Sequence, residues 1–244
     1  MTNHMRVRSL AVLLTTALLA FRPAPLLAGP IADYDSAFRT AYADYRNALF
    51  ATNANNRDGS EKALSAFEAK WSMLTRKYLA TPPPQYSEDP RWSESLAAAT
   101  AIVERAKAEV GNGALAQAHE ILESLRAVFS DMRERNGLIA YSDRIDAFHH
   151  AMEQVLTKSY GGFAGDGLID LTEDVSVLAF LGAELRKAPP PDAAVASDFE
   201  PLVEALNKTV ADLRATVRTG DVPRIKDMRM KLKPAFAKLF VKFG

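Results

Sequence analysis

The chain repeats itself at a constant offset of 107 residues, and this repeat constrains the fold more than any other feature. Apolar positions and helix-breaking residues keep the offset without a gap. Matching pairs include the triple prolines at 82–84 and 189–191, Tyr34 and Tyr141, Trp92 and Phe199, Val103 and Val210, Gly113 and Gly220, Leu125 and Leu232, Phe129 and Phe236, and Gly137 and Gly244. Because a repeated apolar pattern specifies a repeated structural unit, we predict a tandem duplication, with one unit at 29–137 and a second at 138–244.

Each unit has the pattern of four helices. Apolar residues recur three and four positions apart in four successive segments, which is the period of an amphipathic helix. The triple proline at 82–84 must end the second segment, because proline lacks an amide donor. The turn at Gly111–Gly113 is so short that the third and fourth helices must be antiparallel neighbours. No segment resembles a strand, so we predict an all-α fold of two tandem up-down-up-down four-helix bundles.

Capping residues and breakers set the expected boundaries in the second unit. Its first helix is predicted to run from about Tyr141 to Lys158. Polar side chains that accept backbone amides favour helix starts. We therefore expect starts at Thr172, at Ser197 with Glu200 three residues on, and at Asp221. Pro234 is expected to kink the last helix or to loosen its first half.

Residues 1–28 are predicted to be a secretory signal. Two arginines precede an apolar run from Leu10 to Phe21, and small residues follow at Ala28-Gly29, where we place the cleavage site. A membrane anchor is the alternative, but Arg22 and two prolines interrupt the run before it reaches the roughly 18 apolar residues that a span needs. No stable membrane insertion is expected after the signal is removed.

Composition excludes several classes of site. Cysteine is absent, which excludes disulfides, thiolate metal sites, thiol nucleophiles and covalent haem attachment through cysteine. Export without cysteine favours a bacterial periplasm. The 30 basic and 30 acidic residues balance, and no long basic run is present. We therefore expect no nucleic-acid partner, and the sequence identifies no protein partner.

Each unit resembles cytochrome b-562, the periplasmic four-helix bundle that holds one non-covalent haem. The segment Ala80-Thr81-Pro82-Pro83 looks like the join between helices two and three of that family. Gly220 followed by Leu232-Lys233, and Gly113 followed by Leu125-Arg126, look like its last helix. The resemblance covers nearly all of both units and implies the bundle fold.

The haem ligands of that family are not matched. They are a methionine early in helix one and a histidine late in helix four. The histidine position holds Arg133 in the first unit and Phe240 in the second, and neither helix one begins with a methionine. A haem or copper site would therefore need other residues.

The first helix of the second unit offers such residues. On a helical wheel His149 lies at the edge of an apolar face that contains Met152, and His150 points away from that face. The turn at Asn136 brings Met132 near the same place. Imidazole and thioether ligands favour copper, particularly the cuprous ion, so His149, Met152 and Met132 are the candidate ligands for copper, and His149 and Met152 those for haem. The alternative is ordinary core packing.

Two further patterns have both a functional and a structural interpretation. His119 precedes Glu123 by one helical turn, a spacing that can bind a cation but is common on solvated helices. The first unit is rich in aromatic residues, which either line the cavity of a flat ligand or fill the core. They are Tyr34, Tyr42, Tyr45, Trp71 and Tyr78.

Three functions stay open at this point. The first is a haem or metal carrier of the kind used in electron transfer, and the second is a ligand-free binding or scaffold module. The third, a small-molecule enzyme, has the least support, because the chain contains no catalytic triad pattern, phosphate loop or His-Glu-x-x-His motif. We therefore predict a non-enzymatic protein.

Overall fold

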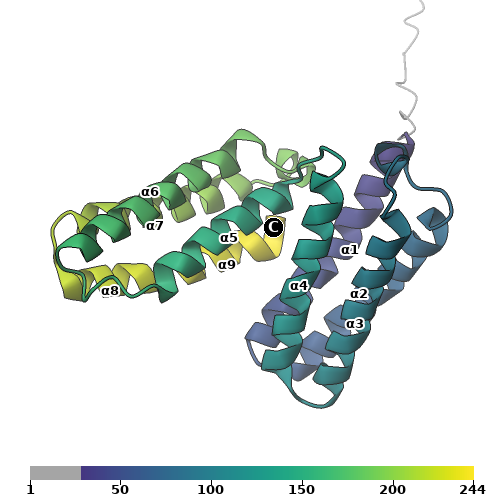
Figure 1. Cartoon of the computed structure of the whole chain (residues 1–244), viewed down its shortest axis with the longest axis horizontal. Coiled ribbons are helices and arrows are strands. Elements are labelled where there is room, and N and C mark those ends of the chain that lie inside the picture. Colours follow the sequence, from purple (N-terminus) through teal and green to yellow (C-terminus); the bar gives the residue numbers. More distant parts are fainter. Residues whose placement is uncertain (1–28) are drawn as a thin grey trace, which may run out of the picture.

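The computed structural model describes residues 29–244, so the predicted signal at 1–28 lies outside the described part of the chain. The described residues form helices joined by turns and loops, with no strand among them (Figure 1). The all-α fold class is thereby confirmed. Within residues 29–244, no helix is both long and apolar enough to cross a membrane.

The first group of helices comprises α1 (Pro30–Asn53), α2 (Arg57–Tyr78), the 3-10 helix η1 (Pro84–Tyr86), α3 (Trp92–Gly111) and α4 (Leu115–Glu134). α1 packs against α2 and α4, and α3 packs against the same two helices. Their apolar stripes meet in a core rich in large side chains, among them Tyr45, Phe67 and Phe129, each at most 1 % exposed. Burying these stripes is what stabilises the helices, since isolated helices of this length are marginal in water.

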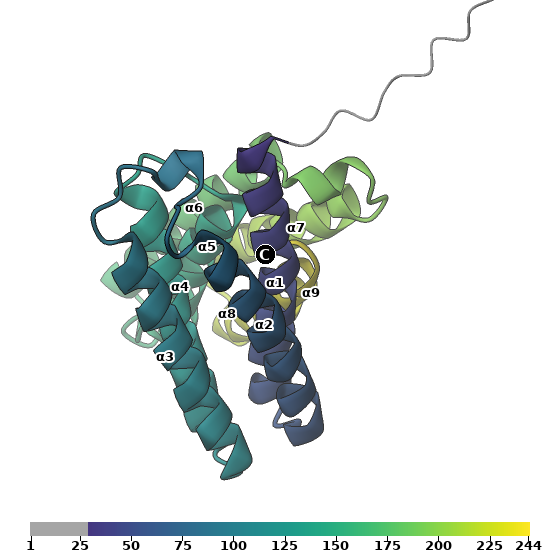
Figure 2. The same cartoon turned by 90° about the vertical axis from the view of Figure 1, so that its right-hand side faces the viewer.

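The second group comprises α5 (Tyr141–Thr157), α6 (Asp166–Lys187), the 3-10 helix η2 (Pro191–Ala194), α7 (Phe199–Val217), α8 (Val222–Met230) and α9 (Leu232–Phe243). α6 packs between α5 and α7, and α9 closes the group by contacting α5 and α7. Figure 1 shows the two groups as separate arms that meet where α4 leads into α5. Figure 2 shows α9 beside α1 at this joint, in agreement with the contacts between these two helices.

The 107-residue offset appears in the structure as well as in the sequence. Three elements of the first group begin 107 residues before their counterparts: η1 and η2 at Pro84 and Pro191, α3 and α7 at Trp92 and Phe199, and α4 and α8 at Leu115 and Val222. Gly113 and Gly220, at matching turns, both have a positive φ, of +79° and +68°. This backbone conformation favours glycine, which explains why both copies carry glycine there.

Pro234 breaks the last helix, as predicted. α8 ends at Met230 and α9 begins at Leu232. A proline ring clashes with the carbonyl of the residue four positions earlier, which is Met230, and it cannot donate to that carbonyl. Asp221 caps α8 as expected, its carboxylate accepting the amide of Arg224 at 3.2 Å.

Two predicted helix starts are wrong. α6 begins at Asp166 rather than Thr172, whose hydroxyl donates to the Leu168 carbonyl inside the helix at 2.7 Å. The apolar stripe continues back through Leu168, which packs against the core, and this packing outweighs the cap signal.

The capping box at Ser197 also does not form, because α7 starts at Phe199 without a side-chain cap. Glu200 instead forms an ion pair with Arg186 at 3.0 Å.

Candidate functional site

His149 lies at the edge of the second group's core, as the helical wheel predicted. Its side chain is 17 % exposed, and its ring stacks on Phe236 with a centroid distance of 5.2 Å. His150, the next residue, is exposed. The sequence therefore placed both rings correctly with respect to the core and the solvent.

Arg126 of α4 occupies the Nδ1 side of His149. Its Nη1 lies 2.8 Å from Nδ1, and because a guanidinium only donates, Nδ1 accepts and the proton of the neutral ring lies on Nε2. Burial and the Arg126 charge lower the pKa of His149 to about 3. A metal on Nδ1 would have to displace this guanidinium, so the Nδ1 side disfavours a metal. Nε2 lies on the other side of the ring, 3.6 Å from Glu153 Oε1.

The predicted thioether ligands are buried on helices of different groups. Met152 is 0 % exposed on α5 and Met132 is 1 % exposed on α4. His119, the other candidate, has Nδ1 3.1 Å from the Thr52 hydroxyl and Nε2 3.5 Å from Glu123. Within residues 29–244, no three His, Cys, Asp or Glu side chains are grouped in a way that could hold a metal ion.

Arg133 and Phe240, which the sequence resemblance places at the position of the haem histidine, lie at the contact between the two groups. Arg133 donates from Nε to Asp143 Oδ2 at 2.8 Å, across the turn between α4 and α5. Phe240 of α9 lies under the guanidinium of Arg126, 4.8 Å from the centroid of the phenyl ring. Neither residue offers an iron ligand, and both contribute to the joint.

A third arginine strengthens the joint from α1. Arg46 is 8 % exposed and donates to three carbonyls in the last turn of α9, those of Val241, Lys242 and Gly244. Carbonyls at the end of a helix lack partners within the helix and carry partial negative charge, so a guanidinium there is favourable. The contact therefore ties the first group to the second.

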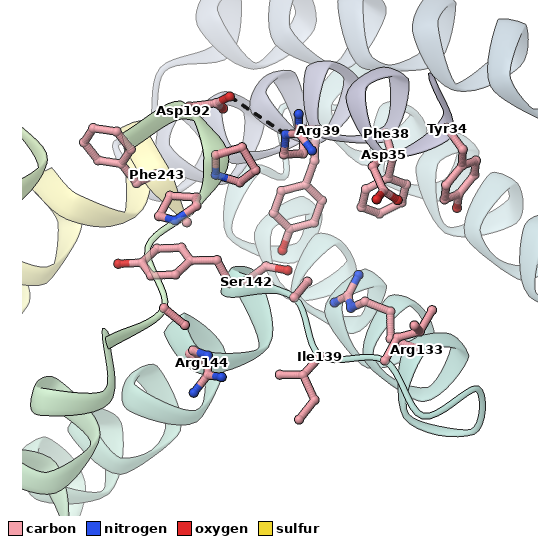
Figure 3. Close-up of a pocket in the computed structure, with 18 of the residues that line it drawn as sticks. Tyr34, Asp35, Phe38, Arg39, Arg133, Ile139, Ser142, Arg144, Asp192 and Phe243 are labelled. Atoms are coloured by element: carbon pink, nitrogen blue, oxygen red, sulfur yellow. Dashed lines mark ion pairs between the residues drawn. The ribbon is translucent and has the colours of Figure 1, made fainter. Parts of the chain in front are cut away.

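A cavity of about 410 Å³ lies between the two groups, beside this joint (Figure 3). We call it the joint cavity. α1 forms one wall, and the chain from Leu138 to Arg144, the prolines 189–191 and the end of α9 form the other. Ile31 and Ile139 line it while remaining 49 % and 75 % exposed, so the cavity has an accessible rim. A volume of this size suits a small molecule.

The α1 wall is aromatic because its residues follow the helical period. Tyr34, Phe38 and Tyr42 are four residues apart and so form one row on the helix. Neighbouring rings along this row stack, with centroids 6.0 and 5.7 Å apart. Tyr86 of η1 and Phe243 of α9 line the cavity too. Tyr34 and Tyr42 thus both fill the core and line a cavity, which combines the two interpretations of the aromatic pattern.

Three of the tyrosines that line the cavity have a buried hydroxyl with no hydrogen-bond partner within residues 29–244. They are Tyr34, Tyr42 and Tyr141. Burial is the main cause that raises the pKa of all three phenols, so they remain protonated donors at neutral pH. A buried hydroxyl without a partner costs about 1–3 kcal/mol, which points to a missing acceptor.

Four arginines also line the cavity, and each has a partner. Arg46 and Arg133 have the partners described above, and Arg144 lies 3.7 Å from Glu184. Arg39 of α1 forms an ion pair with Asp192, 3.9 Å from its Nε, which Figure 3 shows as a dashed line. This distance is too long for a hydrogen bond, so the buried Nε has no hydrogen-bond partner within residues 29–244. The donors without a hydrogen-bond partner in this part of the chain are therefore Arg39 Nε and the three tyrosine hydroxyls.

Tyr34 and Tyr42 were named in the sequence analysis as residues that could line a cavity, whereas Arg39 and Tyr141 were missed. A sequence signal for the joint beside the cavity was present. Arg126 and Arg133 interrupt the apolar stripe of α4 and are only 6 % and 5 % exposed. Charged residues are seldom this buried unless they are paired. Such positions in a predicted core stripe mark the side of a helix that meets another charged or polar surface.

No family model matches the chain, and no curated protein or solved structure is significantly similar to it. The resemblance to cytochrome b-562 therefore stays a prediction from the sequence. The functional argument depends on the geometry of the chain itself.

Proposed function

We propose that this chain is an exported, non-enzymatic binding protein whose joint cavity holds a small organic anion. The observation that carries the proposal is a set of buried donors on residues that line one cavity: three tyrosine hydroxyls and Arg39 Nε, none of which has a hydrogen-bond partner within residues 29–244. Buried polar groups in native proteins are nearly always hydrogen-bonded. Protonated phenols and a guanidinium are donors, so the missing partner is an acceptor, and an anion is the strongest acceptor.

We also propose that each helical group is a four-helix bundle and that the two bundles, at 29–137 and 138–244, arose by tandem duplication. The shared element starts and the matching glycine turns support it. Each group buries its own apolar stripes, so fragments 29–137 and 138–244 should each be helical and unfold cooperatively. Fragments that become helical only when mixed would instead indicate one intertwined domain.

Periplasmic location belongs to the proposal and depends on the sequence of residues 1–28. A charged start, an apolar run and small residues near Ala28 support cleavage there. A binding protein without cysteine is compatible with an oxidising compartment, since it has no thiol to protect. Mass spectrometry of the protein from a bacterial periplasmic extract would show whether the mature chain begins at Gly29.

The lining residues favour binding over catalysis. Ser142 lines the cavity, but no histidine is among the lining residues to activate it. The tyrosines are held protonated, and all four arginines already have a partner. Such groups hold and orient an anion without supplying a nucleophile or a general base.

The earlier hypothesis of haem or copper at His149 and Met152 has less structural support. Arg126 donates to His149 Nδ1 at 2.8 Å, and its positive charge opposes a second cation beside the ring. The joint cavity, in contrast, has room, apolar walls and unsatisfied donors. The geometry therefore supports a carrier of an organic anion better than a carrier of haem or copper, and the sequence had indicated neither this ligand nor this cavity.

Isothermal titration calorimetry with small organic anions tests the binding function. Benzoate, phenyl phosphate, 3-phenylpropanoate and glutarate cover carboxylates and phosphates with and without a ring. We expect at least one of them to bind at one site per chain. A Tyr34→Phe/Tyr42→Phe double variant should bind it at least about tenfold more weakly, since each lost hydrogen bond to a charge is worth roughly 1.5–3 kcal/mol.

Tyr45→Phe is the matched control for this titration. Tyr45 is also a buried tyrosine of α1, but its hydroxyl donates to the Leu122 carbonyl at 2.8 Å and it does not line the cavity. Its loss should leave affinity unchanged. No binding of any anion, or equal weakening by the control and the double variant, would refute the proposed site.

A further inference from the structure

The charge around Arg39 limits the ligand to a single negative charge. Two carboxylates flank this arginine: Asp35 lies one turn earlier on α1, and Asp192 lies 3.9 Å from Nε. The other three arginines of the cavity already have the partners described above. Because Arg39 is already ion-paired with Asp192, a dianion would meet stronger repulsion from these two carboxylates than a monoanion would.

The donors without a hydrogen-bond partner are arranged to hold a carboxylate. Arg39 and Tyr42 are three residues apart on α1, so they are neighbours on the helix surface. A guanidinium presents several N–H groups in a planar fork that matches the two oxygens of a carboxylate. The Tyr42 hydroxyl, which is buried and has no partner, adds a further donor at the same wall.

The remaining walls select an aromatic body. Tyr34, Phe38, Tyr86 and Phe243 contribute rings to the cavity. Tyr34 and Tyr86 meet edge to face, with centroids 5.5 Å apart, and Tyr34 stacks on Phe38. Rings in such arrangements accept another ring by stacking or edge contacts. An aliphatic ligand would fill the same volume without these contacts.

Building on the proposed function, we propose that the ligand is an aromatic monocarboxylate. Arg39 and Tyr42 hold its carboxylate, and the rings of the joint cavity hold its aryl group. The prolines 189–191 and Ile139 cover the opposite wall, so the ligand contacts residues from both helical groups. Binding should therefore stabilise the joint as well as each group, because a ligand that binds only the folded form raises its stability.

The test titrates the full chain with four matched probes. 3-Phenylpropanoate has the ring and one carboxylate, 3-phenylpropan-1-ol has the ring without charge, phenyl phosphate replaces the carboxylate, and glutarate has two carboxylates without a ring. We expect 3-phenylpropanoate to bind at one site, at least tenfold more tightly than each other probe. Arg39→Gln should weaken it by about tenfold to a hundredfold, as expected for a hydrogen bond to a charged group.

Arg218→Gln is the control, because Arg218 is an exposed arginine that does not line the cavity. It should leave the affinity unchanged. Tighter, Arg39-dependent binding of phenyl phosphate or glutarate would overturn the monocarboxylate while leaving an anion site in place. Equal binding of the alcohol would overturn the role of charge. Absence of binding by every charged probe would overturn the proposed function as well.

Discussion

Removing the Tyr42 hydroxyl should make the ligand-free protein more stable, although Tyr42 belongs to the core. Tyr42 is 4 % exposed and its hydroxyl has no partner, so folding removes this group from water without compensation. An unsatisfied buried hydroxyl costs about 1–3 kcal/mol. Tyr42→Phe keeps the ring and its contacts with Phe38 and Phe129. We expect a gain of about 1 kcal/mol in the free energy of unfolding.

Tyr45→Phe provides an internal comparison. Tyr45 is 0 % exposed and lies three residues further along α1, and its hydroxyl donates to the Leu122 carbonyl at 2.8 Å. Losing that bond should cost about 0.5–1.5 kcal/mol. The same atom is deleted from the same residue type in the same helix, so the two variants should move in opposite directions and differ by about 2 kcal/mol.

Urea unfolding followed by circular dichroism at pH 7 measures both changes. The pKa of each phenol is raised by burial, so both hydroxyls stay protonated at this pH. The Tyr42 variant should also lose affinity for the anionic ligand, which would show that the hydroxyl is retained for binding at a cost in stability. A loss of stability in Tyr42→Phe as large as that in Tyr45→Phe would refute this reasoning, because it would mean that the hydroxyl is already satisfied.

Three further predictions concern other parts of the chain. Burial raises the pKa of Asp146 to about 6, above its unfolded value near 3.9, so protonation favours folding as the pH falls from 6 to 4. Relative to Asp146→Asn, the parent protein should gain about 2–3 kcal/mol in the free energy of unfolding when the pH is lowered from 7 to 4. If urea unfolding gave the same free-energy difference between the two proteins at both pH values, the raised pKa would be contradicted. Gly220→Ala should lower the free energy of unfolding by about 1 kcal/mol, because φ at this position is +68°. Gly111→Ala lies at a helical position with open space and should raise it by about 0.5–1 kcal/mol. Equal shifts of the melting temperature in the two variants would contradict this prediction. In a cuprous-ion titration under reducing conditions we expect no site that His149→Phe abolishes, since Arg126 occupies Nδ1; a tight site lost in that variant but kept in His150→Phe would restore the copper hypothesis.

The sequence predicted the helices well because their apolar spacing reflects local burial. Tyr141 and Asp221 mark a start and a cap that the structure reproduces. Pro234 breaks its helix for a reason that is local to the backbone. The helix starts that failed, at Thr172 and Ser197, were predicted from polar side chains. At the start of α6 the packing of Leu168 outweighs the cap signal of Thr172, as packing often does with weak local preferences. At the start of α7, Glu200 pairs with Arg186 instead of closing a capping box.

The joint cavity could not be predicted from one sequence. The cavity depends on how α1 is oriented relative to α5 and α9. The periodicity of each helix carries no information about this relative orientation. Buried arginines were the available signal. Arg46, Arg126 and Arg133 lie on stripes that are otherwise apolar, and each contacts the other group. The aromatic richness of α1 was noticed in the sequence, but whether Tyr34 and Tyr42 face a cavity depends on the second group.

A crystal structure of the protein with 3-phenylpropanoate tests the central claim most directly. The account predicts the carboxylate within about 3.2 Å of Arg39 Nε and the Tyr42 hydroxyl, with the phenyl ring among the aromatic side chains of the joint cavity. It would be contradicted by a cavity that holds only water under conditions where the probe binds in solution, or by a probe bound elsewhere on the chain.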